Sequence, residues 1–139
     1  MTKILIPVDG SEPSLRAIDY AIGRAAAGSV EIYLLNVQPP LPQSVASAAG
    51  HAAVHDYHRA EAAKALAAAE ARLRKAGVAF TSHTALGTPG DMVAEHVDSG
   101  GCDEIVMGAR GLGAMLSLLL GSTTTRVLAL TKVPVTLIK

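Results

Sequence analysis

The chain has 139 residues, carries equal numbers of acidic and basic side chains, and contains only 3% aromatic residues. This length predicts one domain over residues 1–139, large enough to fold without disulfides or metal. Zero formal net charge and scarce aromatic side chains argue against nucleic acid as a partner, because nucleic-acid-binding proteins carry basic surfaces and base-stacking side chains.

Cellular location is indicated by two features. The single cysteine, Cys102, rules out an internal disulfide and is typical of a reducing compartment. The apolar start of the chain meets Asp9 too early for a signal peptide, and the apolar stretch 112–120 is too short to cross a membrane. We therefore expect a cytoplasmic protein that has no membrane partner.

The first part of the chain predicts a strand, a helix and a second strand. A continuous apolar run over 3–8 is typical of a buried strand. Ser11 can cap the helix that follows, and Gly28 ends the helical spacing of its apolar residues. A second apolar run over 31–37 predicts the next strand.

Three prolines, at positions 39, 40 and 42, end this strand and open a stretch that we predict to be flexible as far as about Gly50. This stretch is either a lid or plain disorder. Strong helix formers over 52–76 then predict a long helix that Gly77 closes. The later ranges predict a strand over 78–85, a helix that Thr88 caps over 89–99, a strand over 104–107, a helix from 121 and a strand over 133–138.

Strands alternate with helices throughout, which predicts an α/β fold with a parallel sheet covered on both faces. Right-handed crossovers restrict the topology to a few doubly wound arrangements. Ligands bind such sheets beyond the carboxyl ends of the strands, so function is expected near Asp9, Val37, Gly87 and Gly108.

A helix start late in the chain is suited to an anion. Gly121, Ser122 and Thr123 stand where the fourth predicted helix begins. Free backbone N–H groups and the positive end of the helix dipole favour a phosphate there, and the two hydroxyls add hydrogen bonds.

Upstream, Gly108 and Gly111 let the backbone approach a ligand closely and adopt positive φ, while Arg110 supplies a positive charge. No Gly-Lys pair occurs, so the lysine-containing phosphate loop is absent, and Leu116 breaks the dinucleotide-binding glycine pattern. From spacing alone, these glycines indicate either a phosphate site or a simple connection between a strand and a helix.

The pattern G-x2-G-x9-G-[S/T], which Gly108, Gly111, Gly121 and Ser122 fill, resembles the nucleotide-binding signature of ATP-binding universal stress proteins. Other segments resemble the same family in the same order, and together they cover nearly the whole chain: 4–11, 87–89, 103–108 and 133–135.

The resemblance implies a doubly wound five-stranded parallel sheet of order 3-2-1-4-5 that binds ATP, with or without Mg²⁺. The residues implied to surround adenine and ribose are Pro7, Val8, Asp9, Val37 and Met107. The residues implied to hold ribose and phosphates are Gly108, Arg110, Gly111, Gly121, Ser122 and Thr123. Asp9 has three alternative roles, which are to accept a hydrogen bond from the nucleotide, to contact Mg²⁺, or to cap its own turn.

The last strand, from Val133 to Ile138, is apolar and is expected at a sheet edge, which invites pairing with another chain. The resemblance implies antiparallel pairing of this strand across a twofold axis, giving a homodimer. Coverage by one of the protein's own helices is the alternative.

Other polar residues favour structural interpretations. His51, His55 and His58 have helical spacing that could share a metal, but a solvated first helical turn accounts for them better. Cys102 has no identifiable base, and the acids of the third predicted helix, Asp91, Glu95 and Asp98, are interpreted as solvated.

Three functions remain as hypotheses. The first is a stress-response protein in which ATP occupancy biases conformation or the choice of partner. The second is a slow ATPase or an autophosphorylating protein, whose turnover should be weak because the loop has no lysine. The third is a dimeric scaffold that binds another adenine nucleotide, such as a cyclic one.

Overall fold

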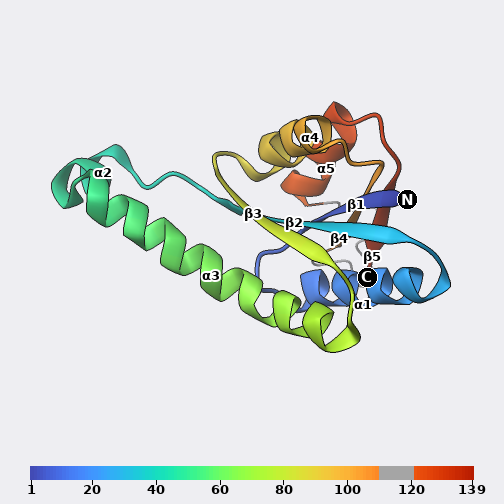
Figure 1. The fold of residues 1–139 in the computed structure, drawn as a ribbon. Helices are drawn as coiled ribbons and strands as arrows, with labels where there is room; N and C mark the ends of the chain where they lie inside the picture. The colour runs from blue at the N-terminus through green and yellow to red at the C-terminus, as the bar shows by residue number, and fades with distance from the viewer. Residues whose placement is uncertain (110–120) are drawn as a thin grey trace.

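A computed structural model describes residues 1–109 and 121–139. Within these ranges, five strands form one parallel sheet in the order β3-β2-β1-β4-β5 (Figure 1). The strands are β1 (Thr2–Pro7), β2 (Val30–Gln38), β3 (Phe80–Leu86), β4 (Glu104–Gly108) and β5 (Val135–Ile138). The helices are α1 (Glu12–Ala27), α2 (Gln43–Ala49), α3 (His51–Ala76), α4 (Pro89–Gly100) and α5 (Ser122–Leu130). The predicted fold class and strand order are confirmed.

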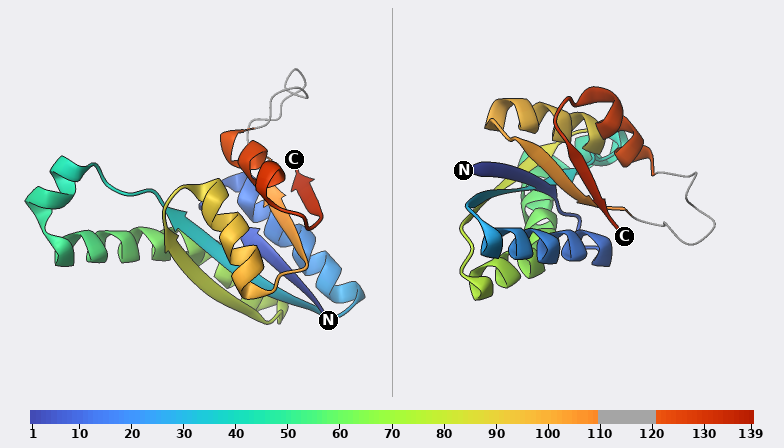
Figure 2. Two further views of the ribbon diagram at one scale, coloured as in Figure 1. Left: turned by 90° about the horizontal axis from the view of Figure 1, so that it is seen from above. Right: turned by 90° about the vertical axis from the view of Figure 1, so that its right-hand side faces the viewer.

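The helices cover the sheet on two sides, with α1 and α3 on one face and α4 and α5 on the other (Figures 1 and 2). Because neighbouring residues of a strand point to opposite faces, β2 contributes Leu34 to one layer and Leu35 to the other. Both side chains are fully buried. The sheet therefore has two hydrophobic cores, one on each face.

Ser11 and Gly10 account for the turn that leads from β1 into α1. Ser11 is the N-cap of α1, and its hydroxyl accepts a hydrogen bond from the Ser14 amide at 3.4 Å. Gly10 has a φ of 83°, and a Cβ there would stand 3.4 Å from the Cα of Ala65 in α3. Glycine therefore permits both the conformation of this turn and the close approach of α3.

The stretch between β2 and α3 differs from its prediction. Residues 39–50 were expected to be flexible, but they contain helix α2, which begins after Pro42. Proline is favourable just before a helix, and the Ser and Ala residues that follow tolerate helical conformation. Gly50, with a φ of 88°, then reverses the chain into α3.

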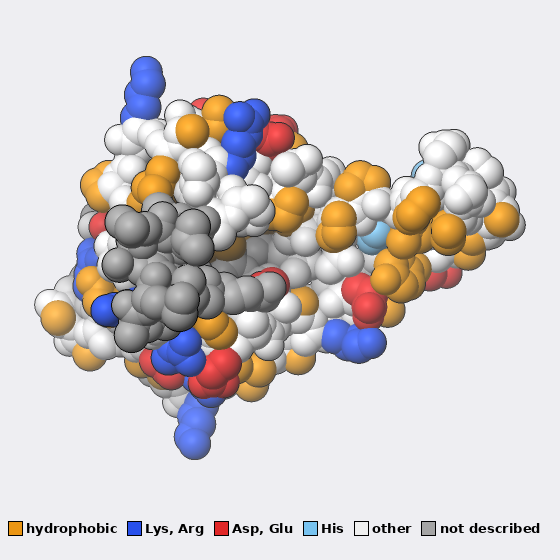
Figure 3. All heavy atoms as spheres, turned by 180° about the vertical axis from the view of Figure 1, so that it is seen from behind, with side chains coloured by type: hydrophobic (Ala, Val, Ile, Leu, Met, Phe, Trp, Pro, Cys, Tyr) orange, Lys and Arg blue, Asp and Glu red, His pale blue; other side chains and the backbone are white. Residues whose placement is uncertain are grey.

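The first turns of α3 project beyond the sheet together with α2 (Figures 1 and 2). The buried residues of α3 begin only at Ala62 and continue to Leu73. Hydrophobic side chains show on the projecting part in Figure 3. Val45 of α2 and Tyr57 of α3 are 47% and 46% exposed. The projecting part, residues 43–61, is called the arm below.

Among the described helices, none combines the length and the apolar character that crossing a membrane requires.

Candidate functional site

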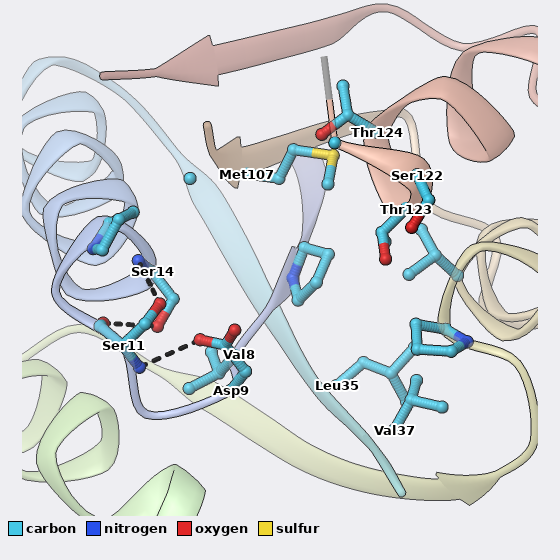
Figure 4. Close-up of a pocket in the computed structure, with 16 residues that line it drawn as sticks. Val8, Asp9, Ser11, Ser14, Leu35, Val37, Met107, Ser122, Thr123 and Thr124 are labelled. Atoms are coloured by element: carbon cyan, nitrogen blue, oxygen red, sulfur yellow. Dashed lines mark hydrogen bonds between the residues drawn. The ribbon is translucent and has the colours of Figure 1, made fainter. Parts of the chain in front are cut away.

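A pocket of about 360 Å³ opens at the carboxyl ends of β1, β2 and β4 (Figure 4). This is the edge of a doubly wound sheet at which ligands bind. Its volume lies in the range of small-molecule sites. The described residues that line it are Pro7, Val8, Asp9, Ser11, Pro13, Ser14, Leu35, Val37, Pro89, Val93, Met107, Gly108, Gly121, Ser122, Thr123 and Thr124.

Three helices, α1, α4 and α5, begin at this pocket. Ser11 and Ser14 at the start of α1 stand across from Ser122 and Thr123 at the start of α5, with Val8 and Asp9 between them (Figure 4). Pro89, the first residue of α4, completes the set. Since each helix start carries partial positive charge, the three dipoles together favour an anionic ligand.

The start of α5 has the most backbone donors to offer. Its first helical hydrogen bond runs from the Thr125 amide to the Gly121 carbonyl at 3.0 Å, so the amides before Thr125 have no acceptor within the helix. The N-cap, Gly121, provides no side-chain cap. The hydroxyls of Ser122 and Thr123 stand beside these amides at the pocket wall. This corner can surround a phosphate with neutral donors.

Asp9 is the charged side chain among the described lining residues. Its Oδ1 accepts a hydrogen bond from the Ser11 amide at 2.9 Å, so the carboxylate caps the turn into α1. Carboxylates are ligands that Mg²⁺ prefers beside phosphates, and Asp9 brings one to the pocket lining. The donor set therefore fits a nucleotide with its cation.

Gly108 has a different structural role from the one we predicted. Its φ is not positive, and neither is that of Gly121. A Cβ at Gly108 would stand 2.4 Å from the backbone carbon of Pro13, so glycine is required here because α1 packs directly on the end of β4. This close packing brings the α1 and β4 walls of the pocket together.

The starts of α4 and α5 are also in close contact. A Cβ at Gly90 would stand 2.5 Å from the Cβ of Arg126. The Arg126 Nε donates to Asp91 Oδ1 at 2.7 Å, which links the two helices. Thr88 is the N-cap of α4, as predicted, although its side chain makes no capping hydrogen bond. Asp91, which was expected to be a solvated acid, stands in the first turn of α4 and forms this ion pair with its side chain 38% exposed.

A buried amide behind the pocket wall was missed from the sequence. Asn36 is 2% exposed, and its Nδ2 donates to the Val8 carbonyl at 2.8 Å. Its Oδ1 accepts from Gln38 Nε2, also at 2.8 Å. Asn36 thereby fixes the backbone that carries Val8 and Asp9. An asparagine near the end of an otherwise apolar strand was the available signal.

Most of the predicted site residues meet at this one pocket. Arg110 and Gly111 lie outside the described residues. The others all line the pocket: Pro7, Val8, Asp9, Val37, Met107, Gly108, Gly121, Ser122 and Thr123. The lining residues that sequence reasoning missed are Ser11, Pro13, Ser14, Leu35, Pro89, Val93 and Thr124. Several of these stand at helix starts, which the caps and prolines had already marked in the sequence.

The histidines of the arm form no recognisable site. In the described part of the chain, no group of three or more histidine, cysteine or acidic side chains could hold a metal. His51 and His55 are exposed, as expected for a solvated turn. His58 departs from that expectation, because it is half-buried and its ring nitrogens are shielded from solvent without a hydrogen-bond partner among the described residues.

Cys102 is buried between α4 and β4, and burial raises the pKa of its thiol. A raised thiol pKa disfavours the thiolate that a nucleophilic cysteine needs. Cys102 packs in the core beside Val97 and Ile105, which supports its structural interpretation.

The sequence was compared with those of known proteins. Two curated relatives match along almost the whole chain. Universal stress protein YxiE of Bacillus subtilis is 27% identical, with 99% of this chain and 98% of the relative covered. Universal stress protein MJ0531 of Methanocaldococcus jannaschii is 30% identical, with 99% of this chain and 81% of the relative covered.

Solved structures give the same result for the fold. A universal stress protein in complex with cAMP superposes with a TM-score of 0.71 at 26% identity, covering 99% of this chain and 96% of its own. The universal stress protein from Archaeoglobus fulgidus in complex with dAMP gives a TM-score of 0.75 at 24% identity, covering 100% of this chain and 98% of its own. The model of the universal stress protein family matches residues 1–139. The chain belongs to the universal stress protein family.

Proposed function

We propose that this protein binds ATP in the pocket at the carboxyl ends of β1, β2 and β4, and that occupancy of the pocket regulates a response to stress. The observation that carries the proposal is the convergence of three helix starts on one pocket, with unpaired amides and two hydroxyls at the start of α5. Family relatives whose structures hold cAMP and dAMP support an adenine nucleotide as the ligand.

In this proposal the apolar and polar walls of the pocket serve different parts of the nucleotide. Adenine and ribose lie against the strand ends, which comprise Pro7, Val8, Asp9, Val37 and Met107. The phosphates lie against Gly108, Gly121, Ser122 and Thr123, with Arg110 and Gly111 as further proposed contacts outside the described residues. Asp9 is the residue that would hold a Mg²⁺ bound with the nucleotide, and the ion would offset the charge of the phosphates there.

A cyclic adenine nucleotide is the second candidate ligand, and the relative in complex with cAMP favours it. ATP carries three phosphates toward the start of α5, whereas a cyclic nucleotide carries one that is tied to its ribose. The two ligands therefore differ in how strongly they depend on the amides near Gly121.

We also propose that the protein is cytoplasmic and forms a homodimer through the strand from Val133 to Ile138. β5 pairs with β4 on one side, and it is the last strand in the order of the sheet. All four of its residues are only half-buried, which leaves apolar surface for a second copy. The mass of the protein in solution tests this pairing.

Thermal unfolding with ATP, AMP and cAMP, each with and without Mg²⁺, tests the proposed ligand. A ligand at a hundredfold excess over its dissociation constant stabilises a protein by about 2.7 kcal/mol. We expect ATP to raise the melting temperature by several degrees. If cAMP raises it and ATP leaves it unchanged, the cyclic nucleotide replaces ATP as the ligand.

Gly121→Val tests the position of the phosphates. Among the described residues, a Cβ at Gly121 meets nothing within 4 Å, and the φ of −61° suits any residue, so the fold should tolerate the change. We expect the variant to keep its melting temperature without ligand and to lose the shift with ATP. Gly28→Val is the matched control, because Gly28 is equally open and lies at the other end of the sheet. Binding that survives Gly121→Val would contradict the proposed phosphate site.

A further inference from the structure

Three aromatic side chains from three elements form a cluster on the α4 face, away from the pocket lining. The Tyr33 ring of β2 stacks on the His83 ring of β3, with centroids 3.8 Å apart and planes at 7°. The Tyr33 Oη lies 2.7 Å from Nδ1 of His96 in α4, which is hydrogen-bond distance. Tyr33 is buried, whereas both histidines are half-buried. We call Tyr33, His83 and His96 the aromatic cluster.

The aromatic cluster fastens α4 to the sheet at two points. One is the hydrogen bond between Tyr33 and His96. The other is Gly100, where a Cβ would stand 2.8 Å from the Tyr33 ring, so the end of α4 lies directly on that ring. The start of the same helix has no side-chain cap and lines the pocket through Pro89 and Val93. Loosening α4 at the aromatic cluster would therefore also shift the residues of this helix that line the pocket.

Protons are the natural input to this cluster, because histidine is the side chain that gains its charge in weak acid. A proton on His83 places a cation in a ring whose centroid is 6.5 Å from that of the His96 ring. The Lys3 ammonium of β1 is a second cation nearby, since its Nζ is 5.6 Å from the centre of the Tyr33 ring on which His83 stacks. Like charges at these separations repel, and partial burial limits the screening by water and salt.

Other groups that face the cluster offset this repulsion only in part. Glu31 of β2 lies 3.8 Å from the Lys3 ammonium, and the Asp103 carboxylate accepts a hydrogen bond from the Lys3 amide. Cys102 is buried and its raised thiol pKa keeps it neutral. Thr81 offers a neutral hydroxyl 3.0 Å from His83 Nε2. The acidic groups therefore pair with Lys3 at the margin of the cluster, and within residues 1–109 and 121–139 neither forms an ion pair or a hydrogen bond with the imidazoles.

The direction of the effect on stability follows from His83. Burial chiefly lowers the pKa of His83 below its ordinary value of 6.5, and His96 and Lys3 lower it further. The unfolded chain then binds a proton that the folded chain resists. Stability is therefore full above about pH 6.5 and falls as the pH drops below that value.

We propose that the aromatic cluster is a proton-operated latch that holds α4 on the sheet at neutral pH and loosens it in weak acid, so that the pocket binds its nucleotide less tightly there. The part that concerns affinity rests on the proposed nucleotide binding. The loosening of α4 does not depend on any ligand.

A double variant without titrating groups tests the latch. His83→Phe keeps the stack on Tyr33, and His96→Asn keeps a hydrogen-bond acceptor near the position of Nδ1. Hydrogen exchange of the backbone amides of residues 90–93 is measured without nucleotide at about pH 7.5 and about pH 5.5, with intrinsic rates corrected. We expect acid to raise exchange in the native sequence and to leave it unchanged in the double variant. His55→Asn, which removes an exposed imidazole from the arm, should behave as the native sequence does.

The affinity for ATP is measured with the same proteins at the same two pH values. We expect the dissociation constant of the native protein to rise about fivefold more than that of the double variant. Titration of ATP itself affects both proteins equally, so it cancels in this comparison. The latch is overturned if both proteins show the same pH dependence of exchange. If no nucleotide binds at either pH, the proposed function fails and the exchange result still decides the latch. Should the double variant not fold, His96→Asn alone is compared in the same way.

Discussion

The two faces of the sheet differ in the side chains that pack on them. The face under α1 and α3 is aliphatic, with Ile4, Ile6 and Leu34 fully buried at its centre. The face under α4 and α5 includes Tyr33, Cys102 and Met107 and opens at one end into the pocket. The first layer reaches the pocket at Val8 and the start of α1, whereas the second lines it with Leu35, Val93 and Met107. The contrast indicates that stability depends most on the first face and that ligand binding depends on the second.

Adjacent residues of β2 offer the sharpest test of this contrast. Leu34 and Leu35 are both fully buried, but Leu34 lies in the α1 and α3 layer while Leu35 lines the pocket. We expect each change to alanine to lower the free energy of unfolding by about 2–5 kcal/mol. Leu35→Ala should also weaken nucleotide binding, whereas Leu34→Ala should not. Chemical denaturation and calorimetric titration, at a temperature where both variants are folded, measure the two effects.

The contrast would be broken if Leu34→Ala weakened binding as much as Leu35→Ala. Such a result would mean that packing on the face under α1 and α3 adjusts the pocket through the sheet. Leu73→Ala serves as the control for a loss of stability alone, because Leu73 is fully buried near the end of α3.

Asn36 connects the face of the sheet under α1 and α3 to the pocket wall. It follows Leu34 by two residues on β2, so its side chain lies on the same face, yet its amide holds the Val8 carbonyl of the pocket wall. Asn36→Leu leaves that carbonyl and the Gln38 amide without their present partner, which should cost about 1–3 kcal/mol of stability. Nucleotide affinity should fall as well, because the backbone around Asp9 is no longer fixed. Denaturation with and without ATP measures both quantities.

Gln38→Met is the milder companion of Asn36→Leu, because it removes only the bond from Gln38 to Asn36 and leaves Val8 held. We expect a smaller loss of stability and unchanged binding. Equal losses of affinity in both variants would show that Gln38, rather than the bond to Val8, determines the shape of the pocket wall.

The strand order and the end of the sheet that carries the pocket could be predicted because they depend on local patterns. Continuous apolar runs gave the strands, and caps and glycines marked the helix ends. The family resemblance then implied the strand order, which the structure confirms. Contacts between distant segments could not be read in this way. The need for glycine at Gly108 comes from Pro13, and the partner of Asp91 is Arg126, in another helix.

Helix α2 was missed for a different reason. Prolines at 39, 40 and 42 are strong signals for an irregular connection, and they outweighed the weak helical preference of the short segment that follows. None of its residues is buried, so the helix rests on local preference: it starts just after Pro42, and the Ser and Ala residues that follow tolerate helical conformation. The same prolines that indicate an irregular connection therefore stand directly before a helix start.

The smallest expected change in stability concerns two ion pairs of equal length on opposite faces. Arg126 and Asp91 join α5 to α4 at 2.7 Å, and Arg72 and Asp19 join α3 to α1 at the same distance. Both pairs are largely exposed, so Arg126→Met and Arg72→Met should each cost about 0.2–1 kcal/mol. Only the first pair lies beside the pocket, where Arg126 contacts Gly90 and helps to align two helix starts.

Arg126→Met should therefore weaken ATP binding, while Arg72→Met should leave it unchanged, although denaturation would barely distinguish the two variants. The salt dependence separates the possible causes. If Arg126 acts by aligning the helices, the loss of affinity should persist at high salt, because packing is not screened. If Arg126 acts only through its long-range charge, the loss should fade at high salt, since exposed charges are screened within about 10 Å at 0.1 M. Equal affinities of the two variants at all salt concentrations would mean that the contact between α4 and α5 has no part in binding, and that the pocket depends on α1 and the strand ends instead.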